Sequence, residues 1–350
     1  MDGVDISALL VTGGCGFVAS NFINYVLSRL HAKVINYDFL ISASNQGNVD
    51  SSCVIPGQYD SVCGDICNRA LFEQVLCRYN VDAVVHFAAE TNVSNSYKNP
   101  LTFVRSNVQG TVTILEACLS YGRLKRFVYV STDEVYGDST LASEMPKTEL
   151  DRLLPTNPYS ASKASAEHFV AVYQKSYGFP ALIVRMCNAY GPRQDVSRVV
   201  PKFIQLALCE KSLTIDGDGK QLRNFMHVTD ICAAIIGLLN KGEAGQIYNI
   251  GSDEEISVID LAKKIKEMVD AEMVAAKLKR PRKESSEFEY RKDRPYNDRR
   301  YYTSADKLKS AIGWKQTKTF QEGLKETVSW YVKKHLTSKS NVTFRNAAYP

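Results

Sequence analysis

Two adjacent carboxylates follow a segment that is predicted to be a buried strand. Residues 127–130 are apolar, aromatic and β-branched, and the triplet Thr132-Asp133-Glu134 comes one serine later. Strand ends are often turns that favour Ser, Thr and Asp, so the segment alone is equally compatible with a structural turn. Two carboxyl groups confined side by side would have pKa values that are pushed apart. One could then accept a proton while its neighbour donates one.

A tyrosine and a lysine further along the chain have a spacing that suits the same chemistry. Tyr159 and Lys163 are four residues apart in "PTNPYSASKASAEHFV", which predicts a helix starting after Pro158, so both side chains lie on one helix face. A nearby ammonium would lower the pKa of Tyr159, and the phenolate would be a general base for a sugar or alcohol hydroxyl. An exposed Tyr and Lys on an ordinary amphipathic helix share this spacing.

The elements that would position these groups begin at the N-terminus. The segment "ALLVTGGCGFVASNFINYVLSRL" predicts a strand, a glycine turn and an amphipathic helix. Gly13 can make the tight turn, and Gly16 lets the backbone approach a pyrophosphate at the positive end of the helix. Asp38 ends the next predicted strand, where its carboxylate would meet ribose hydroxyls and repel a 2′-phosphate. The pattern predicts a dinucleotide site that prefers NAD over NADP.

Strand and helix patterns alternate along the first half of the chain. The predicted strands lie near residues 8–12, 33–38, 59–62, 83–89 and 126–131. Helices between such strands imply parallel pairing with right-handed crossovers. The sequence therefore predicts an α/β fold with a Rossmann-type, doubly wound parallel sheet.

We expect two lobes, with the site in the cleft between them. The predicted boundaries are 1–187 for an NAD-binding domain onto which 225–250 packs back, 188–224 and 251–335 for a smaller C-terminal α/β substrate lobe, and 336–350 for a loose polar tail.

Composition excludes several classes of protein. No apolar run approaches the roughly 18 residues that cross a bilayer, and the acidic N-terminal segment lacks the basic start of a secretion signal. The nine cysteines are scattered, without zinc spacing or a disulfide framework. We therefore expect no membrane contact, no metal, and reduced thiols in a cytoplasmic protein.

The positive charge of the chain is concentrated between residues 277 and 300. No nucleic-acid-binding module accompanies this stretch, so we expect no nucleic-acid partner. Residues 271–287 are interpreted as a solvated insertion. The following "RKDRPYNDRRYY" interleaves Arg with aromatic residues, Asn and Pro, which suits the binding of a compact anion such as a diphosphate.

Several motifs together resemble a known family. Thr-Gly-Gly-x-Gly-Phe, Tyr-x-x-x-Lys and the Asn-x-Tyr-Gly-Pro of "CNAYGP" are similar to those of the extended short-chain dehydrogenase/reductases. Within them, Thr132-Asp133-Glu134 resembles the nucleotide-sugar 4,6-dehydratases that act on dTDP-glucose or UDP-glucose. The resemblance runs from about Leu9 to Tyr331 and includes "HFAAET", "GDGKQLRNFMHVTD" and "DRPYNDRRY".

The resemblance implies a role for each candidate catalytic residue. Tyr159 would take the proton of the C4 hydroxyl while the C4 hydride passes to NAD. Glu134 would remove the C5 proton, and Asp133 would protonate the departing C6 hydroxyl before the hydride returns to C6. Thr132 would hydrogen-bond the C4 oxygen, and Lys163 would hold the ribose and tune Tyr159. The product would be a 4-keto-6-deoxyhexose nucleotide.

The resemblance also implies two sets of binding residues. The residues expected to line the NAD site are Gly13, Gly16, Phe17, Val18, Asp38, Asp65, Ile66, Phe87, Ala88, Ala89, Ser106, Tyr159 and Lys163. Those expected to meet the nucleotide-sugar substrate are Thr91, Thr132, Asn188, Arg198, Val199, Arg223, Arg294 and Asn297. Arg223 and Arg294 are the candidates for the diphosphate, because guanidinium groups bind phosphates bidentately. The chain departs from the family pattern at Asn92-Val93-Ser94 and at Ala189.

Other functions of the same fold remain open at this point. A C4-epimerase needs only the Tyr/Lys pair, and a uronate decarboxylase has no leaving hydroxyl for Asp133 to protonate. A non-catalytic, NAD-bound regulatory protein would not need an intact set of proton-transfer groups. The motifs do not distinguish thymine from uracil in the substrate. Apolar positions on the helices near 108–121 and 161–178 suit either core packing or a homodimer with paired helices.

Overall fold

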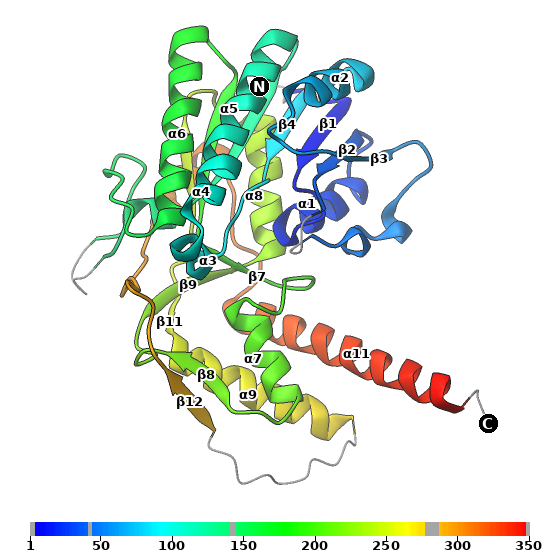
Figure 1. The fold of residues 1–350 in the computed structure, drawn as a ribbon, viewed down its shortest axis with the longest axis vertical. Helices are drawn as coiled ribbons and strands as arrows, with labels where there is room; N and C mark the ends of the chain where they lie inside the picture. The colour runs from blue at the N-terminus through cyan, green and yellow to red at the C-terminus, as the bar shows by residue number, and fades with distance from the viewer. Residues whose placement is uncertain (1–3, 41–43, 140–144, 277–286, 348–350) are drawn as a thin grey trace.

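A seven-stranded sheet forms the larger of two lobes, drawn in the upper part of Figure 1. The computed structural model describes residues 4–40, 44–139, 145–276 and 287–347. All neighbouring strands in the large sheet pair in parallel, in the order β10-β6-β5-β4-β1-β2-β3. The predicted Rossmann-type doubly wound fold is confirmed. The strands are β1 (Ala8–Thr12), β2 (Lys33–Asp38), β3 (Tyr59–Cys63), β4 (Ala83–His86), β5 (Arg126–Thr132), β6 (Ala181–Met186) and β10 (Ile247–Ile250).

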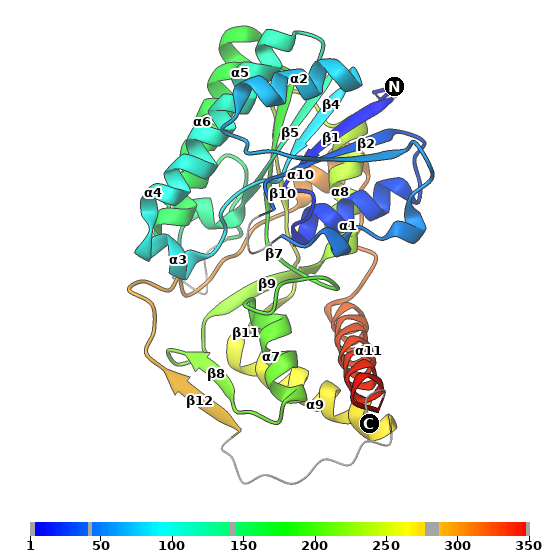
Figure 2. The ribbon, with the colours of Figure 1, turned by 45° about the vertical axis from the view of Figure 1, so that its right-hand side comes forward.

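Alternate residues of the central strands are buried on opposite faces of the sheet. In β1, Leu9 and Val11 pack against one apolar cluster while Leu10 packs against the other. One face is covered by α1 (Phe17–Leu27) and α8 (Val228–Lys241), and the other by α2 (Arg69–Tyr79), α5 (Gly110–Tyr121) and α6 (Pro158–Tyr177). Figure 2 shows the sheet between these two helix layers. The strands are buried on both faces, which explains their continuous apolar runs.

The predicted helix near 101–120 is interrupted. It consists of α4 (Pro100–Phe103), a π-helical turn η3 (Val104–Gln109) and α5, and it follows the short α3 (Val93–Lys98). Asn107 in η3 is fully buried; its side chain accepts from the Glu90 amide at 2.8 Å and donates to the Ser162 hydroxyl at 2.9 Å. The π-helical turn therefore places one amide side chain between the end of β4 and helix α6.

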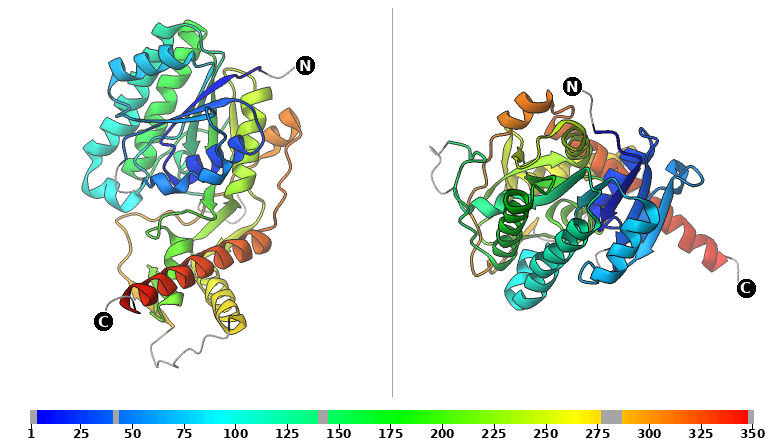
Figure 3. Two further views of the ribbon diagram at one scale, coloured as in Figure 1. Left: turned by 90° about the vertical axis from the view of Figure 1, so that its right-hand side faces the viewer. Right: turned by 90° about the horizontal axis from the view of Figure 1, so that it is seen from above.

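The smaller lobe has its own apolar core. It contains α7 (Val199–Leu208), α9 (Val258–Ala275) and α11 (Phe320–Ala347), with the paired strands β8 (Leu213–Asp216) and β12 (Phe288–Arg291). A second small sheet joins β7 (Asn188–Tyr190), β9 (Leu222–His227) and β11 (Glu255–Ser257). Figure 3 shows α11 beside α9 along this lobe.

Three features differ from the predicted boundaries. Helix α10 (Asp306–Ile312) contacts α8 and β10, and Trp314 belongs to the core of the larger lobe. This stretch was predicted in the substrate lobe but packs on the larger lobe. Helix α11 continues to Ala347, where a loose tail from 336 was expected. The predicted insertion 271–287 starts inside α9, and residues 277–286 lie outside the described residues. No helix in the described ranges offers a stretch both long and apolar enough to cross a bilayer.

Candidate active site

The glycine loop follows β1 and opens α1. Gly13 has φ +69°, and a Cβ there would lie 2.8 Å from Cα of Ala88, so only glycine fits. Gly16 is the N-cap of α1 and provides no side-chain cap, so the first backbone N–H groups of the helix point toward the loop. A positive helix end with a close-fitting glycine turn suits an anion such as a pyrophosphate.

Asp38 lies at the end of β2 beside this loop and is almost fully buried. Its carboxylate accepts hydrogen bonds from the Cys15 amide at 2.9 Å, the Leu40 amide at 2.7 Å and the Ser44 hydroxyl at 3.0 Å. The carboxylate thus holds the glycine loop against the loop after β2. Its position at the carboxyl edge of the sheet, one strand from the pyrophosphate loop, fits the ribose contact that the sequence predicted.

The other predicted cofactor residues surround the same edge of the sheet. Asp65 follows β3 and forms an ion pair with Arg105 at 2.6 Å. Burial by itself would raise the pKa of Asp65, but the hydrogen bond from the Cys67 amide and the pair with Arg105 lower it overall. Ala88 donates its amide to the Thr12 hydroxyl at 3.2 Å. The aromatic ring of Phe87 lies 5.3 Å from that of Phe22, so Phe87 also serves the core. Phe17 and Val18 are partly buried and pack against that core. Ile66 contacts Gly110. Ala89 follows Ala88 in the chain, and Ser106 lies in η3.

The two adjacent carboxylates form the first turn of the 3-10 helix η4 (Asp133–Tyr136), directly after β5. Thr132 caps this turn, because its hydroxyl accepts from the Glu134 amide at 3.3 Å and donates to Asp133 Oδ1 at 3.3 Å. Asp133 is only 2% exposed, and its Oδ2 has no hydrogen-bond partner in the described structure. Burial, and next the charge of Glu134, raise the pKa of Asp133 to about 8.

Glu134 has a more polar environment than Asp133. Its Oε2 accepts from Asn157 Nδ2 at 3.2 Å and lies 3.5 Å from the Tyr301 hydroxyl. Burial raises the pKa of Glu134, while the Asn157 bond and the Arg223 charge act in the opposite direction. The neighbouring carboxyl groups therefore differ in how readily each one ionises.

Tyr159 and Lys163 lie in the first turns of α6, as their spacing predicted, and both are buried. Lys163 donates to the Val130 carbonyl at 2.7 Å, and burial lowers its pKa to about 7 although Glu167 opposes this. The pKa of Tyr159 is raised, first by burial and then by the Glu134 charge. The structure thus differs from the expectation that Lys163 lowers this pKa, because the ammonium group is directed at a strand carbonyl and the phenol is buried near a carboxylate.

The smaller lobe supplies the basic residues. Arg223, in β9, donates to Asn297 Oδ1 at 3.1 Å and to the Asp298 carbonyl at 2.7 Å. Arg198 donates to the Thr91 carbonyl at 3.1 Å and to its hydroxyl, which joins the two lobes, and Val199 starts α7 next to it. The positive charge of Arg223 acts to lower the pKa of both Asp133 and Glu134, and the charge of Arg294 acts to lower the pKa of Glu134.

Two polar side-chain atoms of the predicted substrate set are buried without a partner among the described residues. They are Nδ2 of Asn188, in β7, and Nε of Arg294. A native structure rarely leaves buried donors unpaired. Both donors are suited to oxygen atoms of a bound anion or sugar.

Three further residues of the site were missed in the sequence: Asn157, Asp298 and Tyr301. Asn157 is the N-cap of α6 in a capping box, and Asn before Pro at a helix start is a readable cap signal. Asp298 and Tyr301 lie within the "RPYNDRRY" stretch, but only the folded chain brings them to Glu134.

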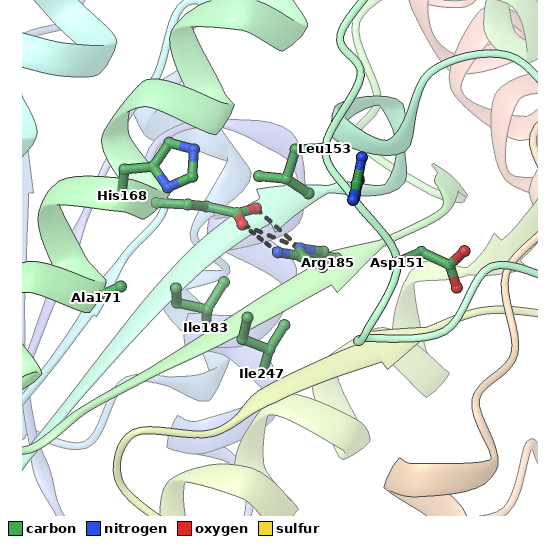
Figure 4. A pocket seen from close by; sticks show the side chains of 9 residues that line it. Asp151, Leu153, His168, Ala171, Ile183, Arg185 and Ile247 are labelled. Atoms are coloured by element: carbon green, nitrogen blue, oxygen red, sulfur yellow. Dashed lines mark hydrogen bonds and ion pairs between the residues drawn. The ribbon is translucent and has the colours of Figure 1, made fainter.

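A surface cavity of about 450 Å³ lies further along α6 and contains none of the predicted site residues. It is lined by Asp151, Arg152, Leu153, Glu167, His168, Ala171, Ile183, Arg185 and Ile247. Figure 4 shows Arg185 among these side chains. Its guanidinium forms a bidentate pair with Glu167, with distances from 2.7 to 3.2 Å. The donors of Arg185 are already used by Glu167 and Tyr136, so this ion pair is structural.

Residues 10–327 match the family described as GDP-mannose 4,6 dehydratase. A trifunctional UDP-glucose 4,6-dehydratase/UDP-4-keto-6-deoxy-D-glucose 3,5-epimerase/UDP-4-keto-L-rhamnose-reductase of Arabidopsis thaliana is 40% identical over 92% of this chain and 47% of its own length. The chain spans about half the length of the first curated relatives that it matches.

Solved structures of nucleotide-sugar enzymes are similar to this chain over almost its whole length. The dTDP-glucose 4,6-dehydratase of Bacillus anthracis, crystallised with NAD, is 39% identical with a TM-score of 0.83, over 94% of this chain and 97% of that one. The UDP-glucose 4-epimerase of Thermotoga maritima, with UDP-glucose, is 27% identical with a TM-score of 0.82, over 94% of this chain and 99% of that one. These similarities confirm the resemblance that the motifs predicted. Because the family match extends over nearly the whole chain, the protein belongs to the GDP-mannose 4,6 dehydratase family.

Proposed function

We propose that this protein is an NAD-dependent nucleotide-sugar 4,6-dehydratase that converts dTDP-glucose or UDP-glucose to the 4-keto-6-deoxy sugar nucleotide. The observation that carries the proposal is the pair of adjacent carboxyl groups with unequal environments at the end of β5. Asp133 is buried and its Oδ2 has no hydrogen-bond partner among the described residues, whereas Glu134 accepts a hydrogen bond from Asn157. Elimination of water needs one acid and one base near the same sugar, and this pair supplies them.

The residues around the glycine loop would hold the cofactor. The N-terminus of α1 and the Gly13–Gly16 turn suit the pyrophosphate, and Asp38 suits an adenosine ribose without a 2′-phosphate. NAD, when bound, supplies a hydride acceptor and a positive charge on its oxidised ring. That charge would favour ionisation of Tyr159, whose phenol is otherwise disfavoured as an anion by burial.

The chain's own groups would then divide the proton transfers. Tyr159 takes the proton of the C4 hydroxyl, whose oxygen Thr132 holds. Glu134 is the member of the pair that is available as a base, because a hydrogen-bond donor favours its ionised form, and it removes the C5 proton. Asp133, with a pKa raised to about 8 by burial and by the Glu134 charge, still carries a proton at neutral pH and gives it to the C6 hydroxyl.

The basic residues of the smaller lobe would hold the diphosphate and the nucleotide. Arg223 and Arg294 suit the diphosphate, and Asn188 and Asn297 suit neighbouring oxygen atoms. The contact between Arg198 and Thr91 links the two lobes over this region. A bound sugar nucleotide would therefore be enclosed from both sides.

A C4-epimerase is the second candidate, because a UDP-glucose 4-epimerase shares the fold at a TM-score of 0.82. Epimerisation uses the Tyr/Lys pair and gives no role to Asp133 and Glu134. The shared fold does not separate these reactions, whereas the paired carboxylates favour dehydration.

The test is to incubate the purified protein with dTDP-glucose and UDP-glucose separately and to identify the products by mass spectrometry. Loss of one water from the sugar nucleotide, without net consumption of NAD, is the expected result. The substrate that reacts faster identifies whether the enzyme prefers thymine or uracil in the nucleotide. An unchanged mass with inversion at C4 would assign the protein to the epimerases. No conversion of either substrate would contradict the proposal.

We also propose a homodimer that functions in the cytoplasm. Large apolar side chains are exposed on α4, η3 and α6: Leu101 (81%), Val104 (50%), Phe169 (41%) and Val172 (54%). An exposed apolar surface on neighbouring helices suits pairing with the same surface of a second copy. All nine cysteines are free thiols, which fits a reducing compartment.

A further inference from the structure

A phenol from the stretch that follows β12 lies next to Glu134, and a carboxylate of the same stretch accepts a hydrogen bond from that phenol. Asp298 is 3% exposed and Tyr301 is 5% exposed. Both oxygens of Asp298 lie close to the Thr156 hydroxyl, at 2.7 and 2.8 Å, and one of them accepts from the Tyr301 hydroxyl. The Tyr301 oxygen also lies 3.5 Å from Glu134 Oε2. The roles proposed above for the paired carboxylates do not use these two residues.

The direction of the hydrogen bonds follows from counting protons. Asp298 faces two hydroxyl donors, so its ionised form satisfies both of them. The hydroxyl of Tyr301 has one proton, and that proton is directed to Asp298. The remaining lone pairs of the Tyr301 oxygen can only accept, so Glu134 can bond to this oxygen only when Glu134 itself carries a proton.

We propose that Asp298 and Tyr301 are positioning residues that increase the base strength of Glu134, by offering a hydrogen-bond acceptor to its protonated form. The proposal rests on the function proposed above, in which Glu134 takes the C5 proton. The protonated carboxyl group that results would be held by Tyr301, and the negative charge of Asp298 would disfavour return to the ionised form.

The other groups around Glu134 include some that lower its pKa and one that raises it. The Arg223 and Arg294 charges favour its ionised form, as does the Asn157 amide, whereas Asp298 opposes it. The guanidinium of Arg223 lies 4.5 Å above the Tyr301 ring, which keeps the phenol in place without using its hydroxyl. The groups facing Glu134 from the surrounding elements are Tyr97, Asp133, Asn157, Tyr159, Arg223, Arg294, Asp298 and Tyr301.

Tyr301→Phe is the most direct test, because it removes the hydroxyl and keeps the ring under Arg223. The first measurement is a ¹³C NMR titration of Glu134 in protein labelled at glutamate carboxyl carbons, with the signal assigned by Glu134→Gln. The pKa of Glu134 is expected to be lower in Tyr301→Phe and in Asp298→Asn than in the unchanged protein. An equal or higher pKa in both variants would overturn the proposal, whether or not the protein turns over a sugar nucleotide.

The second measurement is steady-state kinetics with the substrate found to be active. For Tyr301→Phe, kcat is expected to fall by roughly tenfold, the effect of one hydrogen bond, with KM unchanged. The acid limb of the kcat profile should move to lower pH, and the isotope effect with C5-deuterated substrate should increase because C5 deprotonation becomes slower. Tyr302→Phe removes a hydroxyl one residue away and should change none of these quantities.

The outcomes separate the two proposals. Failure of the unchanged protein to eliminate water contradicts the proposed function, and the NMR titration still decides the role of Tyr301. A normal dehydration rate with an unchanged acid limb and isotope effect in Tyr301→Phe overturns the positioning role alone. A rise in KM with kcat unchanged would make Tyr301 a substrate contact and would overturn it as well. If Tyr301→Phe does not fold, Asp298→Asn decides by the same measurements.

Discussion

The carboxyl group of Asp133 shows how burial decides the chemistry of a single residue. The unfolded pKa of an Asp is near 4, and in this site burial and the Glu134 charge raise the pKa of Asp133 to about 8. Between these values the folded state binds a proton that the unfolded state releases. Stability from this group therefore falls as the pH rises from about 4 to about 8.

Replacing Asp133 by Asn should separate the stability effect from the catalytic one. We expect Asp133→Asn to lower kcat by about 100-fold, because the general acid is lost, and to be more stable than the unchanged protein above pH 8, because no charge has to be buried. The measurements are product formation by mass spectrometry and thermal unfolding as a function of pH. Asp253→Asn, at an 81% exposed side chain, is the control; it removes only an exposed ion pair with Lys309, so kcat should be unchanged and the stability should change by less than about 1 kcal/mol.

The same carboxyl group predicts the alkaline limit of activity. Since Asp133 must carry a proton to assist departure of the C6 hydroxyl, kcat should fall as the pH rises through about 8. The check is a pH profile of kcat at saturating substrate. A profile that stays flat to well above pH 8 would show that the departing hydroxyl does not depend on Asp133.

At the scale of elements, a buried polar network joins the helix and the turn that carry the two halves of the site. Arg185, in β6, pairs with Glu167 of α6 and donates to the Tyr136 hydroxyl at 2.7 Å. Tyr136 is the last residue of η4 and donates to Asn249 of β10 at 2.8 Å. The network therefore fixes η4, with Asp133 and Glu134, relative to α6.

Tyr136→Phe should weaken this link without removing any group that transfers a proton. The loss leaves Asn249 Oδ1 without its donor and one Arg185 N–H without its acceptor, which costs about 2 kcal/mol of unfolding free energy. We expect the denaturation midpoint to fall and kcat to fall less than in Asp133→Asn. Tyr290→Phe, at an exposed side chain of β12, is the matched control; an equal loss of stability there would contradict the role of the network.

The sequence was most informative where one element alone determines the geometry. The glycine turn, Asp38 at a strand end and the spacing of Tyr159 and Lys163 are local patterns, and each lies where it was expected. The direction of the Lys163 ammonium depends on the Val130 carbonyl of another element, and local spacing contains no information about it. Likewise, Tyr301 reaches Glu134 across 167 residues of chain, through tertiary packing that short-range patterns do not encode.

At the scale of the whole molecule, the chain passes repeatedly between the lobes. The chain enters the smaller lobe at β7 and returns to the larger lobe in α8 and β10. It enters the smaller lobe again at β11, returns to the larger lobe in α10, and ends in the smaller lobe with α11. The lobes therefore share connections as well as contacts, and we expect them to unfold together. Calorimetry should give one transition, and NAD at 100 times its Kd should stabilise the entire molecule by about 2.7 kcal/mol. Two transitions, with only the first moved by NAD, would contradict this.

The exposed apolar surface on α4, η3 and α6 predicts the oligomeric state. Val172→Glu places a charge in that surface and should convert the proposed dimer to a monomer in sedimentation experiments, because a buried unpaired charge opposes association. Val274→Glu makes the same change at a 73% exposed position on α9 and should leave the dimer intact. A monomer before any substitution would contradict the proposed pairing.

The π-helical turn at Val104–Gln109 gives this part of the chain a fixed length. A π turn contains one residue more than an α turn, and here the additional residue brings Asn107 between Glu90 and Ser162. Deleting a single residue from 104–109 would let the turn become an ordinary α-helix and would leave the residues on either side in nearly the same alignment, but it would move the residues inside the turn relative to Glu90 and Ser162. Asn107 would then lose its partners beside Tyr159 and Lys163. The segment is thus expected to lose function on any change in the number of its residues.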